Sequence, residues 1–191
     1  MTQSRIAPIE PPYESDVQRT LERMMGGSGI DPLLLFRVVA RNTHVLDKFR
    51  STGSYLLNFG TLDPLEREIV VHRTCARCGS EYEWGVHVFV YGRRLGLSEE
   101  QIRATVLGEA GDPAWSERQA LLVRFADEMF ETSTLSDPLW EELANHWTTE
   151  QLVELVALAG QYRLVSYFTN AFRLPLEDFA ERFPPKEETE G

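Results

Sequence analysis

The sequence is that of an acidic protein of 191 residues, with a formal net charge of −11 and 42% hydrophobic residues. This length and hydrophobic content suffice for a domain with a buried core. The negative charge argues against nucleic acid and anionic membrane surfaces as partners, because both require a basic face. With two cysteines, the chain is not expected to have a disulfide framework. It has no apolar run of about 18–20 residues and no apolar stretch in residues 1–12, so neither a membrane span nor a secretory signal is expected. These features predict a cytoplasmic protein.

Signals for helix starts and ends divide the first half of the chain into helices. They predict helices over residues 15–25, 32–40 and 64–78, and one around residues 45–49. Ser15 is placed to cap the first helix. Gly79 and Ser80 mark a corner, where glycine ends one helix and serine begins the next.

The second half of the chain continues in the same way. Capping-box pairs, Ser98 with Gln101 and Ser116 with Gln119, predict helices that begin at Glu99 and Glu117 and end near residues 107 and 131. Further helices are expected over residues 80–95, 137–147 and 149–172. No stretch alternates with the period of a β-strand, so the expected fold class is all-α.

The domain organisation is expected to be simple. Residues 1–30 form an N-terminal segment with one helix, residues 31–183 form a single helical domain, and residues 184–191 form a disordered tail. A weak repeat relates residues 66–70 to residues 117–121. It reflects either an internal duplication or the chance recurrence of similar helix starts.

Most of the chemically active side chains lie between residues 68 and 87. Glu83 and His87 are four residues apart, so their side chains meet on one face of the predicted helix and form a possible acid/base pair. The alternative is structural, because Glu83 also stands at the position that closes a capping box with Ser80. Glu68 is placed to reach this pair from the preceding helix, where a buried carboxylate beside another would have a raised pKa; a solvated Glu68 is the alternative.

The two cysteines form a Cys-x-x-Cys pattern, Cys75 to Cys78, which has several interpretations. They lie at the end of a helix, where the dipole disfavours a thiolate, although Arg73 and Arg77 flank them. Buried structural thiols and a redox pair both remain open. A zinc site that adds His72 and Glu68 is disfavoured because four clear ligands are lacking. The residues considered for a pocket, some of which could equally be packing residues, are His72, Tyr82, Trp84, Tyr162 and Asn170.

Residues 63–104 resemble the carboxymuconolactone decarboxylase superfamily, also called AhpD-like. The resemblance rests on Leu65-Glu66-Arg67-Glu68-Ile69-Val70, on Glu81-Tyr82-Glu83-Trp84 followed by His87, and on the segment from Leu95 to Ile102. The stretch from Trp115 to Asn170 resembles the same branch. The resemblance implies an AhpD-like helical bundle built by internal duplication of a helical repeat, and it implies assembly into homo-oligomers.

Two activities are implied by the resemblance. AhpD-like thiol peroxidases carry Cys-x-x-Cys-x-x-x-His and an upstream glutamate. With His87 as the anchor, the glutamate corresponds to Glu68, but the two cysteine positions fall on Ser80 and Glu83. The decarboxylase branch carries a glutamate four residues before its histidine, as Glu83 and His87 do.

We therefore expect an enzyme that needs no cofactor or metal and performs acid/base chemistry on a small oxygenated substrate, by decarboxylation, isomerisation or elimination. His87 moves the proton, Glu83 orients it and Glu68 acts as a second acid. A thiol peroxidase or redox sensor that uses Cys75 and Cys78 is the first alternative. A non-catalytic helical assembly module is the second.

Assembly is also expected from the apolar pattern. Residues 33–36 are consecutive large apolar residues, and apolar residues nearly surround the helix over residues 86–91. A helix that is apolar on all sides must be buried on several sides. This pattern predicts a closed homo-oligomer, a dimer or a trimer-based assembly.

Overall fold

The computed structural model describes residues 4–26 and 31–185, and within these ranges the secondary structure is helical without a strand. The helices are α1 (Ser15–Met25), α2 (Leu34–Val39), α3 (Thr43–Asn58), α4 (Pro64–Arg77), α5 (Glu81–His87), η1 (Val88–Gly92), α6 (Arg93–Leu95), α7 (Glu99–Leu107), α8 (Glu117–Thr132), α9 (Asp137–Ala144) and α10 (Thr149–Ala171). The predicted all-α fold class is confirmed. Most of the tail predicted to be disordered lies outside the described residues.

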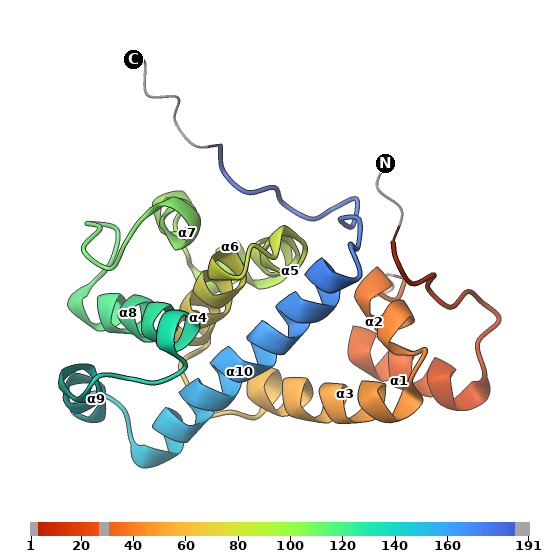
Figure 1. The fold of residues 1–191 in the computed structure, drawn as a ribbon, viewed down its shortest axis with the longest axis horizontal. Coiled ribbons are helices and arrows are strands. Elements are labelled where there is room, and N and C mark those ends of the chain that lie inside the picture. Colours follow the sequence, from red (N-terminus) through yellow and green to blue (C-terminus); the bar gives the residue numbers. More distant parts are fainter. Residues whose placement is uncertain (1–3, 27–30, 186–191) are drawn as a thin grey trace.

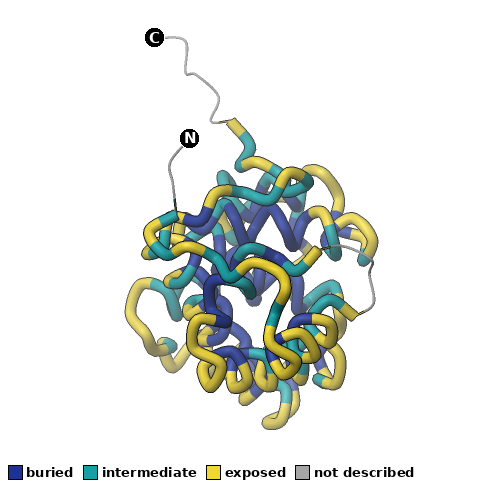
Figure 2. Tube along the Cα trace, turned by 90° about the vertical axis from the view of Figure 1, so that its right-hand side faces the viewer, coloured by how far each residue is buried: buried dark blue, intermediate teal, exposed yellow. Residues whose placement is uncertain are grey.

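Helix α4 is the central element of the fold. Its side chains from Arg67 to Cys75 are all buried, and it packs against α5, α7, α8 and α10 (Figure 1). The helix begins where the sequence indicates, because the Asp63 carboxylate accepts hydrogen bonds from the first backbone N–H groups and Pro64 occupies the first turn. Figure 2 shows the buried stretches of the chain gathered inside a shell of exposed loops and helix faces.

The corner between α4 and α5 determines the direction of α5. Gly79 has a φ of 64°, a left-handed conformation that favours glycine, and it turns the chain into α5. Helix α5 does not continue uniformly to residue 95 as predicted. Residues Val88–Gly92 form a π-helical turn, after which the short α6 resumes. A π-turn inserts an extra residue and rotates the side chains that follow it.

The helix caps are partly as predicted. The capping boxes of Ser98 and Ser116 are both formed. The prediction that Ser15 caps α1 is wrong, because the cap position is Glu14 and makes no side-chain bond. No helix of the described residues is both long and apolar enough to span a lipid bilayer.

A C-terminal strap, residues 174–185, crosses the outside of α5. The Glu181 N–H donates to the carbonyl of Gly85 at 3.3 Å, and the Phe183 N–H donates to Glu81 Oε1 at 2.9 Å. The Phe183 ring packs against the Trp84 ring with centroids 5.2 Å apart. The strap thereby holds the helix that carries Glu83 and His87.

We expect Gly85→Ala to detach the strap and to lower the melting temperature. A Cβ atom at Gly85 would overlap the carbonyl oxygen of Glu181. This oxygen is a backbone atom, so it cannot move aside as the end of a flexible side chain could. Gly53→Ala is the matched control, because its Cβ would meet only the Gln161 side chain at 3.6 Å and alanine favours a helix by up to about 1 kcal/mol. Thermal unfolding and limited proteolysis of both variants test this. Equal stability of the two variants would contradict the role given to the strap.

The apolar residues that led to the prediction of assembly are mostly covered by the chain itself. Leu33, Leu35, Val86 and Val88 are all buried, and Phe89 is the largely exposed member of the two segments. The physical reason given for an interface there is therefore wrong. Among the described helices, α10 carries the largest group of exposed large apolar side chains: Val153, Val156, Leu164 and Tyr167.

The homo-oligomer remains a prediction, and α10 is where we propose that it forms. Val153 is 67% exposed and Tyr167 is 54% exposed on this helix. Apolar side chains exposed together on one surface are typical of a protein–protein interface. Light scattering at micromolar concentration should give a multiple of the 21.9 kDa chain mass. Val153→Glu combined with Val156→Glu should reduce it to one chain mass. A monomeric wild-type protein would contradict the prediction.

Candidate functional site

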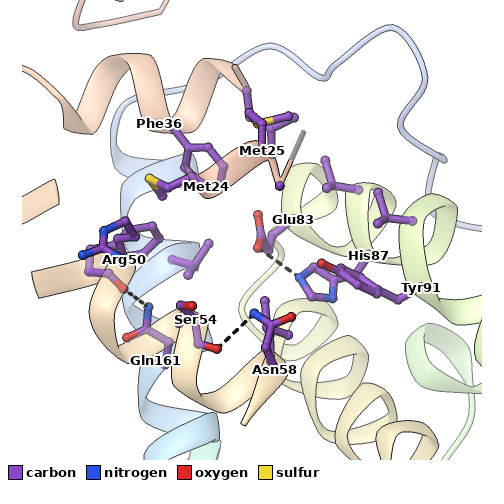
Figure 3. Close-up of a pocket in the computed structure, with 18 of the residues that line it drawn as sticks. Met24, Met25, Phe36, Arg50, Ser54, Asn58, Glu83, His87, Tyr91 and Gln161 are labelled. Carbon is purple, nitrogen blue, oxygen red and sulfur yellow. Dashed lines mark hydrogen bonds and ion pairs between the residues drawn. The ribbon is translucent and has the colours of Figure 1, made fainter. Parts of the chain in front are cut away.

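A cavity of about 320 Å³ lies between the N-terminal helices and α5. Helix α3 forms its floor with a polar row, and Met24, Met25 and Phe36 lie above it (Figure 3). Glu83 and His87 of α5 form the wall at one end. A volume of this size fits a small molecule. The N-terminal segment predicted as separate from the domain therefore supplies part of the cavity.

His87 lies between two carboxylates at this wall. Its Nδ1 donates to Glu68 Oε2 at 2.7 Å, and its Nε2 lies 3.4 Å from Glu83 Oε1. The second oxygen of Glu68 accepts a hydrogen bond from Arg67 Nε at 3.1 Å. The structure thus brings together the three residues predicted to be catalytic. Glu83 and His87 line the cavity, whereas Glu68 lies behind His87 and does not.

The charges of this cluster stabilise one another. Burial disfavours a charged His87, but the Glu68 carboxylate, its hydrogen bond and Glu83 outweigh burial and raise the His87 pKa to about 9. Burial likewise opposes ionisation of Glu68, but the charge and hydrogen bond of His87 hold the pKa of Glu68 below its ordinary value. The prediction that Glu68, as a buried carboxylate beside another, has a raised pKa is therefore wrong, because the neighbouring cations outweigh burial. This direction favours Glu68 as an ionised partner of the His87 imidazolium over the second acid expected from the sequence.

Glu83 is not used as a helix cap. The Ser80 hydroxyl bonds to the Thr169 hydroxyl at 2.8 Å, and the start of α5 has no side-chain cap bond. The structural interpretation of Glu83 as a capping-box residue is therefore wrong. Its Oε2 atom is buried and has no hydrogen-bond partner, although it belongs to a residue that lines the cavity. Buried acceptors usually have a partner, so this unpaired atom is a candidate contact for a ligand.

Two tyrosines complete the surroundings of His87. The Tyr91 ring lies 5.0 Å from the His87 ring, and the Tyr162 ring lies 4.9 Å from it in an edge-on contact. Both line the cavity. Tyr91 belongs to the π-turn, and burial raises its pKa, which keeps the hydroxyl protonated. Tyr91 was not among the predicted site residues. The spacing of four residues from Glu83 to His87 to Tyr91 was the available signal.

Of the five residues considered for the pocket, Tyr162 alone lines the cavity. Tyr82 donates to Glu177, and Trp84 Nε1 donates to Thr105 at 2.9 Å, so both are packing residues with satisfied polar atoms. Asn170 is exposed and donates to the Cys78 carbonyl. His72 is completely buried, and burial lowers its pKa to about 4.

The cysteines lie behind the site and not in the cavity. Cys75 is fully buried and Cys78 half-buried, and both are free thiols. Burial raises the pKa of Cys75 well above its ordinary value, and burial also raises that of Cys78. A raised pKa depletes the reactive thiolate, so this environment does not favour the redox alternative. Within the described ranges, the side chains form no group of three or more potential ligands that could hold a metal ion.

We expect a thiol reagent such as Ellman's to modify the native protein slowly and at Cys78 alone, because Cys75 is shielded by burial. In denaturant both thiols should react. Cys78→Ser should abolish the native reaction and leave one thiol in denaturant. Rapid loss of both thiols on brief exposure to peroxide would instead support redox chemistry.

The helical arrangement defines an AhpD-like fold, as the sequence resemblance predicted. The fold is similar over nearly the whole chain to that of an uncharacterised peroxidase-related protein from Silicibacter sp. TM1040, with a TM-score of 0.80 and 18% identity over 95% of this chain and 96% of that one. The debrominase Bmp8, in a cysteine-to-alanine form with 2,3,4-tribromopyrrole, gives a TM-score of 0.78 and 13% identity, and covers 93% and 94% of the two chains. At these identities, the likeness shows the fold.

Two further similarities are narrower. ATU0492 from Agrobacterium tumefaciens, described as a putative antioxidant defence protein AhpD, gives a TM-score of 0.65 and 18% identity over 73% of this chain and 94% of that one. In sequence, the chain is 29% identical over 126 residues to YnjA of Escherichia coli (strain K12). The matched residues cover 65% of this chain and 68% of YnjA. The sequence matches no model of a known protein family.

Proposed function

We propose that the protein is an acid/base enzyme that moves a proton on a small oxygenated substrate bound in the cavity. The observation that carries this proposal is the buried, unpartnered Glu83 Oε2 beside His87 at the cavity wall. A base must reach the proton that it removes, and Glu83 offers the free acceptor. Isomerisation, elimination and decarboxylation next to a carbonyl all use such a step.

The three residues have different roles in this proposal. Glu83 Oε2 removes a proton from carbon, and the electron pair moves onto the carbonyl oxygen to give an enolate. The imidazolium of His87 stabilises the developing negative charge and supplies a proton to the product. Glu68 holds the imidazolium through the 2.7 Å bond to Nδ1, so it positions His87 and does not touch the substrate. These roles differ from those expected from the sequence, because Glu83 and not His87 carries the free acceptor.

The comparisons support a small ligand without specifying the reaction. A protein of this fold, the debrominase Bmp8, binds 2,3,4-tribromopyrrole, a single small ring. Other proteins with the fold are described as peroxidase-related or antioxidant, and the thiol positions of this chain do not favour that chemistry.

Hydrogen exchange tests the proposal without knowledge of the product. The protein is incubated in D2O with a panel of small lactones and oxo acids, and loss of the proton signal next to the carbonyl is followed by NMR. We expect at least one compound to exchange faster with the protein than with buffer alone. A panel without any accelerated exchange, at protein concentrations near the substrate concentration, would count against proton abstraction.

A further inference from the structure

Two buried polar atoms without hydrogen-bond partners belong to residues at the cavity. They are Arg50 Nε, a donor, and Glu83 Oε2, an acceptor. Arg50 lies at the end of the cavity away from His87 in Figure 3, and Glu83 lies beside His87. Leaving such groups unpaired is costly, by about 1–3 kcal/mol for each and more for charged groups. A ligand that accepts at one end and donates at the other would satisfy both.

Arg50 is only partly used by the chain. Its Nη2 donates to Asp47 at 3.2 Å on the exposed side, while Nε is buried. The Arg50 side chain as a whole is 26% exposed. A partly desolvated guanidinium attracts an anion more strongly than one in bulk water. A carboxylate is the chemical group that a guanidinium binds with the best geometry.

A polar row connects the two ends of the cavity. Arg50, Ser54 and Asn58 are four residues apart on α3, so they follow one another on one face of the helix (Figure 3). At about 1.5 Å per residue, the backbone positions of Arg50 and Asn58 lie roughly 12 Å apart. A ligand of one ring or a short chain spans such a cavity. Met24 and Phe36, on the opposite side, offer it an apolar surface.

We propose that the cavity takes a small organic carboxylate with an apolar body, whose carboxylate binds Arg50 and whose opposite, hydrogen-bearing end meets Glu83. Arg50 is then the residue that determines the substrate class. The assignment of the reacting end rests on the proposed function, whereas the carboxylate site rests on Arg50 alone.

The test uses binding and requires no turnover. The probe is 4-hydroxybenzoate, which has a carboxylate at one end and an O–H donor at the other. Its neutral analogue is 4-hydroxybenzamide, and benzoate lacks the O–H. Calorimetric titration should show 4-hydroxybenzoate binding at least about tenfold more tightly than the amide, a ratio that corresponds to about 1.4 kcal/mol. It should also bind more tightly than benzoate.

Variants assign the two ends of the ligand. Arg50→Gln should abolish the preference for the carboxylate, and Arg50→Lys should retain part of it. Lys48→Gln is the matched control, because it makes the same change of charge on α3 at a residue whose side chain is 87% exposed, and it should keep the preference. Glu83→Gln should reduce the preference for the hydroxyl and leave that for the carboxylate. Melting temperatures of all variants identify any loss of folding.

The outcomes separate this proposal from the proposed function. Equal affinity for acid and amide, no binding of 4-hydroxybenzoate at millimolar concentration, or an unchanged preference in Arg50→Gln would each overturn it. Arg23, an exposed arginine at the same cavity, offers a further check. If Arg23→Gln and not Arg50→Gln removes the preference, the assignment to Arg50 is wrong. A carboxylate preference without any hydrogen exchange would leave the binding site standing and reject the proposed chemistry.

Discussion

Replacement of Glu83 by glutamine should lower the rate of enzyme-catalysed hydrogen exchange by about 10²–10⁴-fold, the range typical of a general base. Glutamine keeps the size of the side chain but cannot accept a proton at neutral pH. The Glu83 Oε2 atom has no hydrogen bond in the protein, so the variant loses no internal contact of that atom. NMR in D2O with the compound that exchanges fastest measures the effect.

Two further variants define the role of Glu83 against that of its neighbours. His87→Gln should cause a loss of similar size, because the imidazolium faces the same end of the cavity. Glu99→Gln is the control, since Glu99 pairs with Arg93 at the surface, and it should leave the rate unchanged. Exchange by Glu83→Gln within about threefold of the wild-type rate would remove Glu83 from the reaction, because a general base contributes more than that.

The sequence predicts the helices well because their ends carry strong local signals. The capping boxes at Ser98 and Ser116, Pro64 in the first turn of α4 and Gly79 at the corner each act through neighbouring backbone atoms. Such interactions depend on a few adjacent residues. They can therefore be identified without knowledge of the tertiary fold.

Predictions that depend on tertiary contacts were less successful. Ser80 bonds Thr169, which is 89 residues away, so the expected capping box with Glu83 does not form. The apolar residues of α5 and η1 are mostly covered by the chain itself, with Phe89 as the exposed exception. The apolar pattern led to the prediction of a subunit interface at these residues, because hydrophobic periodicity does not distinguish a subunit interface from a protein core.

The sequence predicts part of the candidate site. The residues that it does not identify join the site only through the tertiary fold. Glu68, Glu83 and His87 were identified from spacing and from the family resemblance. Arg50 was not, because α3 joins the cavity through its tertiary packing against α1, α2 and α10. The four-residue spacing of Arg50, Ser54 and Asn58 is visible in the sequence, but without the fold it is equally typical of a solvated helix face.

The second large effect concerns stability at alkaline pH. The His87 pKa is about 9 in the folded protein, compared with 6.5 for the unperturbed side chain. The folded protein therefore holds a proton between these values that the unfolded chain releases. This contribution is fully present below pH 6.5 and is lost as the pH rises through 9. Between pH 6.5 and 8.5, the free energy of unfolding should fall by roughly 2–3 kcal/mol.

Acid pH should also destabilise the protein, for different reasons. Burial lowers the His72 pKa to about 4, so His72 stays neutral while the unfolded chain takes up a proton below pH 6.5. This contribution is present above pH 6.5 and is lost as the pH falls toward 4. The pKa of Glu68 is also lowered, so its contribution is present above its ordinary value of 4.5 and is lost at lower pH. Stability should therefore be greatest near pH 6.5.

Glu68→Gln should remove the alkaline dependence and lower the overall stability. The variant takes away the carboxylate that raises the His87 pKa most, so the folded-state pKa should fall back toward 6.5 and both states should release the proton over the same pH range. Breaking a buried ion pair by removal of one partner costs about 3–5 kcal/mol. Glu99→Gln, which alters an exposed pair with Arg93, should cost less than about 1 kcal/mol and keep the wild-type pH dependence. Urea unfolding of all three proteins at pH 6.5, 7.5 and 8.5 measures these effects. A wild-type free energy of unfolding that does not change over this range would show that Glu68 does not hold His87 as an imidazolium. A pH dependence that persists in Glu68→Gln would show the same.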